Sequence, residues 1–146
     1  MVFEPSAAPR GREEFIAWFN AQTQWSEPHG YNDPSVASPA LRSWYAAITR
    51  EFPNLNAPGV DDDDVTDRMT DYSIGRDVIY AAFAWSEAEA AYETVRPLAI
   101  EHGVGFYDVS GDEGEGEILF PGAALAPASQ GVWRKIAAAF GNRAGE

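Results

Sequence analysis

The segment from Thr70 to Ser86 constrains the fold of this chain more than any other part of the sequence. Apolar and polar side chains alternate over residues 71–74, and a Gly-Arg-Asp turn follows at 75–77. The apolar run at 78–84 is rich in β-branched and aromatic side chains, which is typical of a strand covered on both faces. The pattern predicts a β-hairpin, and we expect its two strands to form the centre of a small sheet.

Three amphipathic helices are indicated by apolar side chains that recur every three or four residues. They are expected at about residues 13–25, 38–52 and 86–102. Ser38 is an N-cap for the second helix, and Ser86 and Glu89 have the spacing of a capping box at the start of the third. Gly103 is placed to cap the end of that third helix. Pro97 lies inside it, so we expect a kink or an irregular last turn there.

The remaining strands are short and lie near the two ends of the predicted domain. They are expected at residues 2–4, 104–109 and 117–120. Helices and strands are therefore mixed without a regular parallel repeat, which favours an α+β fold: a mostly antiparallel sheet of about five strands with helices packed on one face. Residues 1–121 are expected to form one domain, and residues 122–146 a linker followed by a short C-terminal helix.

The charge balance limits which partners the chain can bind. Ten Lys and Arg residues stand against 23 Asp and Glu residues, which gives a net charge of −13. A surface this negative repels phosphate backbones, so we expect no nucleic-acid partner and favour a protein with a basic surface. Cysteine is absent, and no apolar run is long enough to span a bilayer or to form a leader. We therefore expect a cytoplasmic protein; its oligomeric state stays open.

Two acidic segments are the candidate partner-binding residues. They comprise Asp61, Asp62, Asp63 and Asp64 in one segment, and Asp108, Asp112, Glu113 and Glu115 in the other. Consecutive aspartates lack the spacing of a calcium loop, and the 108–119 segment lacks the glycine and the final glutamate that such a loop requires. The glycines at 111–116 alternate with acids, which would repel a phosphate. We predict solvated acidic loops and neither a metal site nor a cofactor.

No catalytic constellation is recognisable in the sequence. There is no nucleophile elbow, no zinc-binding His-Glu-x-x-His and no phosphate loop. The residue types therefore favour a protein without enzymatic activity. One alternative is a small-molecule-binding or carboxylate-based hydrolytic domain, with Tyr72, Asp77, Tyr107 and Asp108 around a pocket at the end of the sheet. That alternative predicts an aspartate with a raised pKa in a deep cavity.

Several segments in combination resemble a family of small acidic bacterial proteins of unknown function. The matching segments are Val2-Phe3-Glu4-Pro5, residues 71–76, 82–86 and 102–110, and Gly116-Glu117-Ile118. The resemblance covers roughly residues 1–121, and similar proteins place Met-Ser-Tyr-Asp-Leu and one further residue before Val-Phe-Glu-Pro. It implies no established activity and no catalytic residues. By analogy, the size and acidity are similar to those of immunity proteins that bind and neutralise bacterial toxins.

Overall fold

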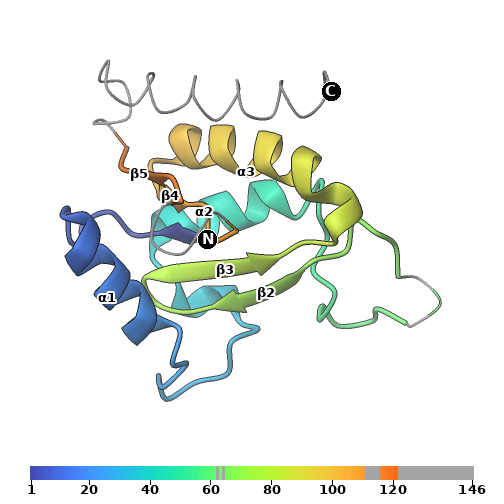
Figure 1. Cartoon of the computed structure of the whole chain (residues 1–146). Helices are drawn as coiled ribbons and strands as arrows, with labels where there is room; N and C mark the ends of the chain where they lie inside the picture. The colour runs from blue at the N-terminus through green and yellow to red at the C-terminus, as the bar shows by residue number, and fades with distance from the viewer. Residues whose placement is uncertain (62, 64, 111–115, 122–146) are drawn as a thin grey trace, which may run out of the picture.

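The computed structural model describes residues 1–61, 63, 65–110 and 116–121 (Figure 1). Its helices and strands are β1 (Val2–Phe3), α1 (Arg12–Gln22), α2 (Pro39–Ile48), β2 (Asp71–Ile74), β3 (Val78–Ala82), α3 (Ala88–His102), β4 (Gly105–Tyr107) and β5 (Ile118–Leu119). Short 3₁₀ turns precede α2 and α3, at Pro34–Val36 and Trp85–Glu87. The predicted C-terminal helix lies outside the described residues.

The strands form one five-stranded sheet in the order β2-β3-β1-β4-β5, and every neighbouring pair is antiparallel. The fold is therefore α+β, as predicted. The predicted hairpin is present as β2 and β3, but its place in the sheet was predicted wrongly. The first strand, β1, enters between β3 and β4, so the hairpin lies at one edge. Although β1 has only two residues, it is the middle strand of the sheet, and both Val2 and Phe3 are fully buried there.

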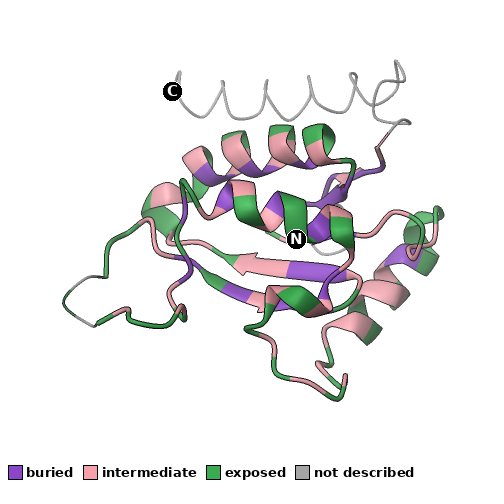
Figure 2. Cartoon of the chain, turned by 180° about the vertical axis from the view of Figure 1, so that it is seen from behind, coloured by how far each residue is buried: buried purple, intermediate pink, exposed green. Residues whose placement is uncertain are grey.

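Helices cover both faces of the sheet, whereas the sequence suggested a single covered face. Side chains of successive strand residues point to opposite faces. One face packs against α2 and α3 through Val2, Ile79 and Phe106. The other face packs against Phe15 of α1 through Phe3, Val78 and Tyr107. Figures 1 and 2 show α2 and α3 together on one side of the strands, with α1 apart from them.

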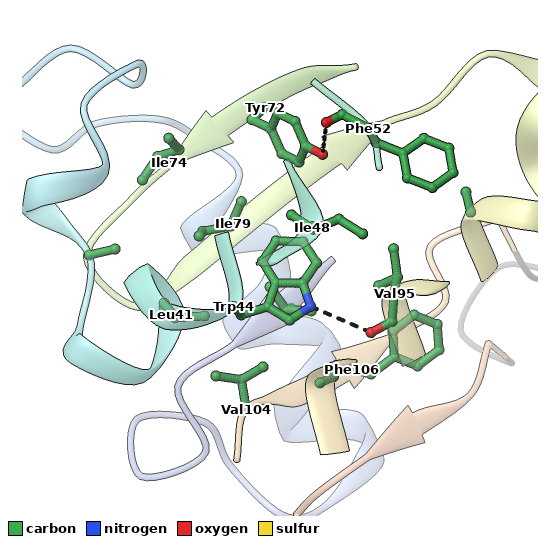
Figure 3. Packing of buried hydrophobic residues seen from close by; sticks show 14 of the residues in the cluster. Leu41, Trp44, Ile48, Phe52, Tyr72, Ile74, Ile79, Val95, Val104 and Phe106 are labelled. Carbon is green, nitrogen blue, oxygen red and sulfur yellow. Dashed lines mark hydrogen bonds between the residues drawn. The ribbon is translucent and has the colours of Figure 1, made fainter. Parts of the chain in front are cut away.

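The larger core lies between the sheet and the α2–α3 pair (Figure 3). Trp44 of α2 is fully buried and donates its indole N–H to the Val95 carbonyl of α3 at 3.4 Å. The Tyr72 hydroxyl of β2 donates to the Phe52 carbonyl at 2.7 Å, so the polar tip of this buried ring is satisfied. The first bond joins α2 to α3, and the second joins β2 to the segment that follows α2.

The helix ends test the predicted capping signals. Ser38 caps α2, because its hydroxyl accepts the Leu41 N–H at 3.4 Å, and Gly103 ends α3 in the left-handed conformation with φ of 70°. The capping box at Ser86 was predicted wrongly: α3 begins at Ala88 after a 3₁₀ turn, and no side chain caps it. The α3 helix continues through Pro97 to His102.

The predicted boundaries of α1, α2, β4 and β5 were too wide. The α1 helix ends at Gln22, and Trp25 lies beyond it with φ of 53°, a conformation unusual for a non-glycine residue. The α2 helix ends at Ile48, and β4 and β5 are each shorter than expected. No helix in the described part of the chain is long and apolar enough to cross a membrane.

Candidate functional site

The most distinctive feature of the sheet is a cavity of about 400 Å³ where β3 and β4 end. Tyr80–Ala82 of β3 lie on one side, and Asp108–Ser110, which follow β4, lie on the other. The first turn of α3 covers it with Ala88, Ala91 and Tyr92. We call this cavity the slot.

The slot lies next to the paired part of β1, between the ends of β3 and β4. In the paired region Val2 lies opposite Ile79 of β3 and Phe106 of β4. Beyond this point β3 continues to Ala82, and the Met1 amino group donates to the Tyr107 carbonyl of β4 at 3.0 Å. Because β3 and β4 are each antiparallel to β1, they run in the same direction, one strand apart where β1 separates them.

The walls of the slot are mostly apolar. Trp85 lines it and is 87% exposed, which is unusual for so large an apolar side chain. No role was predicted for Trp85 from the sequence, although it directly follows the apolar run of the hairpin. Ala88 and Ala91 are small, so the space beneath α3 stays open. An exposed tryptophan beside an apolar cavity is typical of a binding surface.

A buried ion pair contacts Tyr92, one of the residues that line the slot. Glu117 is 5% exposed, and its carboxylate accepts hydrogen bonds from Arg96 Nε at 3.0 Å and Nη2 at 3.3 Å. The Tyr92 hydroxyl donates to the same carboxylate at 3.1 Å. Burial and the adjacent Glu117 charge raise the pKa of Tyr92 well above its usual value. Tyr92 therefore stays neutral and links the slot wall to the Arg96–Glu117 pair.

The two acidic segments approach this end of the sheet from different parts of the chain. The residues after the aspartate run are fixed to the start of α3, because Asp67 accepts the Ser86 hydroxyl at 3.2 Å and Arg68 pairs with Glu87 at 2.9 Å. Asp108 lines the slot directly and accepts the Ser110 hydroxyl at 2.6 Å.

The predicted partner-binding residues divide into described and undescribed positions. Asp61 and Asp63 are exposed, and Asp108 is partly buried at the slot. Asp62, Asp64, Asp112, Glu113 and Glu115 lie outside the described residues. Of the predicted residues, the structure places only Asp108 at the slot, while Asp67, just after the aspartate run, contacts Ser86 next to Trp85.

The residues of the alternative pocket do not converge. Tyr107 and Asp108 line the slot, but Tyr72 is buried against Phe52, and Asp77 lies in the β2–β3 turn. Burial does raise the pKa of Asp77, yet Asp77 lines neither the slot nor a second cavity between α1 and the hairpin. This second cavity, about 330 Å³, lies where the sheet backbone is paired.

The two histidines have structural contacts. His29 Nε2 lies 2.9 Å from Glu27 Oε1, and the same oxygen accepts the Arg76 backbone N–H at 3.1 Å, so this cluster fastens the 26–31 loop to the hairpin turn. His102 Nδ1 lies 2.9 Å from the Ser43 hydroxyl and connects α3 with α2. Within the described ranges no group of three or more potential metal ligands gathers.

Comparison with known proteins found no matching family model, no matching curated protein and no matching solved structure.

Proposed function

We propose that this chain is a non-enzymatic, acidic protein-binding module of the cytoplasm, which binds a partner with a basic surface. An immunity-like role, in which the partner is a basic toxin that the module neutralises, agrees with this proposal. The observation that carries it is an apolar slot with an exposed tryptophan, next to carboxylates from two separate segments.

Several aspartates of the described residues take part in no ion pair with another described residue. The ion pairs formed within the described part of the chain use Glu27, Glu51, Glu87 and Glu117. The aspartates at positions 61, 63, 67, 71 and 108 take part in none of these pairs. Such carboxylates steer a basic protein toward the surface and influence its orientation, and the apolar slot then supplies affinity.

Charge-neutralised variants test the proposal. Partners retained by the immobilised protein are identified, purified and measured by isothermal titration calorimetry. The test variant is Asp61→Asn/Asp63→Asn/Asp108→Asn, in which the amide oxygen introduced at position 108 can still accept the Ser110 hydroxyl. The matched control is Glu13→Gln/Glu14→Gln/Glu101→Gln, which changes the net charge equally at exposed positions on α1 and α3.

We expect the test variant to weaken binding about tenfold or more, which corresponds to about 1.4 kcal/mol. The control variant should bind within about twofold of the wild type, since distant exposed charges are screened by salt. Added salt should weaken the wild-type complex. The proposal is overturned if the partner binds both variants equally, or if the proteins retained are themselves acidic and insensitive to salt.

A further inference from the structure

We propose that the second cavity, between α1 and the β2–β3 hairpin, binds a small organic cation whose charge is carried by a methylated ammonium group. We call it the hairpin cavity. This inference goes beyond the proposed function, because the two residues on which it depends, Trp25 and Asp71, line the hairpin cavity and not the slot. The volume of about 330 Å³ accommodates one such group with a short stem.

One face of the hairpin forms the floor of the hairpin cavity. Ser73 of β2 lies opposite Tyr80 of β3, and Asp71 lies opposite Ala82. Alternate residues of a strand point to the same face, and residues directly opposite each other on neighbouring strands share that face. All four side chains therefore point toward the α1 side of the sheet, away from Tyr72, whose ring lies in the larger core.

The end of α1 supplies the walls. Phe19 and Thr23 line the cavity and lie four residues apart, so they share one face of the helix where it ends. Trp25 follows with φ of 53°, a strained conformation for a residue with a side chain, and strain of this kind is concentrated at ligand-binding sites. Its ring centre lies 6.2 Å from that of Tyr80 at an interplanar angle of 89°. The two rings thus form adjacent walls at right angles.

The chemistry of the lining is that of a cation site. Phe19, Trp25 and Tyr80 contribute three aromatic rings, and the face of an aromatic ring carries partial negative charge. Asp71 is the only charged residue among those that line the cavity. A cation placed between the rings is therefore attracted by the ring faces and by one carboxylate, and no lining residue repels it.

The Asp71 carboxylate is held in position and lacks a cation of its own. Its Oδ1 accepts a hydrogen bond from Asn56 Nδ2 at 2.8 Å, which orients the group. Asp71 forms no ion pair with another described residue. A bound ammonium ion would supply the missing positive charge.

The aromatic walls favour a methylated ammonium group over a primary one. A primary ammonium brings three N–H donors into the site, and each of them requires a hydrogen-bond acceptor. A methylated ammonium has apolar methyl groups that pack against the rings, and its charge needs only a surface of negative potential. Groups of aromatic rings are the usual protein site for such ligands.

The probe is choline, titrated into the full chain and followed by NMR. Two controls separate charge from shape: the neutral alcohol in which a carbon atom replaces the nitrogen of choline, and ethanolamine, which lacks the methyl groups. We expect choline to shift the signals of the Trp25 indole and the Tyr80 ring, and both controls to bind about tenfold more weakly or worse. Equal binding of either control overturns the proposal, and so does a response at Trp85 in place of Trp25.

Neutralising Asp71 tests the charge without changing the shape of the site. Asp71→Asn keeps an oxygen that can accept the Asn56 N–H. The matched control is Glu101→Gln, at an exposed position of α3, which packs against the opposite face of the sheet. Choline should bind about fivefold more weakly or worse to Asp71→Asn and within about twofold of wild type to Glu101→Gln. Equal affinity of the two variants would contradict a role for the carboxylate.

Replacing Trp25 tests the aromatic wall. Trp25→Leu keeps an apolar side chain but removes the ring, and we expect a loss of affinity for choline of about tenfold. Trp25→Phe restores a ring and should bind choline within about threefold of wild type. Trp85→Leu makes the matched change at the slot and should have no effect. Choline binding that survives in Trp25→Leu, or that is lost equally in Trp25→Phe, overturns the proposal.

A last comparison identifies the source of the ammonium group. Choline stands for a free compound, and a peptide with one trimethyl-lysine stands for the same group on a protein tail. Tighter binding of choline supports a free ligand, and tighter binding of the peptide supports a modified protein. If neither shifts the Trp25 signals, the hairpin cavity is not a cation site. The Asp61→Asn/Asp63→Asn/Asp108→Asn variant should bind the tighter of the two like the wild type, because none of its positions lines this cavity.

Discussion

Glu117 is the one carboxylate buried among the described residues, and it holds Arg96 and Tyr92 together beside the slot. Removing one partner of a buried ion pair leaves the other charge without its compensation, and this costs about 3 kcal/mol or more. We expect Glu117→Ala to lower the free energy of unfolding by about that amount in urea denaturation.

The matched control for Glu117 is Glu93→Ala, an exposed glutamate on the same helix as Arg96. Surface substitutions of this kind change the free energy of unfolding by about 0.5 kcal/mol or less. A loss of less than about 1 kcal/mol in Glu117→Ala, as is typical of exposed pairs, would contradict the buried ion pair.

His29 gives the fold a pH-dependent contact. Its interaction with the Gly30 carbonyl and then with Glu27 raises its pKa above the ordinary 6.5. A raised folded-state pKa means that the stabilisation is complete below the unfolded value and is lost as pH rises through the folded value. The stability difference between wild type and His29→Gln should therefore be larger at pH of about 5.5 than at about 8.5. An NMR titration of His29 with a midpoint below 6.5 would contradict this assignment.

At the scale of elements, Ser38 and Ser86 were both predicted to cap a helix, but only Ser38 does so. The Ser38 hydroxyl accepts a backbone N–H of α2, whereas the Ser86 hydroxyl donates to Asp67 and caps no helix. Ser38→Ala should lower the free energy of unfolding by about 1 kcal/mol. Ser86→Ala should cost about 0.5 kcal/mol or less, as exposed polar contacts do. Both variants are measured by thermal unfolding. An equal loss of unfolding free energy in the two would indicate that Ser86 caps α3 after all, and would contradict this assignment.

These elements also show what sequence patterns can and cannot predict. The hairpin, the α2 start at Ser38 and the Gly103 cap were predictable, because each depends on residues close together in the chain. The position of the hairpin in the sheet was not predictable, because it depends on the pairing of β3 with Val2 and Phe3, which are far away in the sequence. The slot was missed for the same reason. Asp108 was a predicted site residue, but Trp85 carries no local signal of its exposure.

The whole molecule carries a net charge of −13, and the aspartates at positions 61, 63, 67, 71 and 108 lack ion-pair partners among the described residues. Like charges held in a compact fold repel one another, and salt screens them over about 10 Å at 0.1 M. We expect the midpoint of urea unfolding to rise as sodium chloride increases from low to moderate concentrations.

Salt should act in opposite directions on folding and on partner binding. Screening relieves repulsion within the folded chain, but it also weakens the attraction between the acidic segments and a basic partner. The Asp61→Asn/Asp63→Asn/Asp108→Asn variant should show a smaller salt response in both measurements, because the same carboxylates contribute to each. If salt strengthened binding of the partner, apolar contacts alone would account for the complex, and the acidic segments would have no part in recognition. If salt weakened binding equally in the wild type and the variant, the relevant charges would lie elsewhere on the surface.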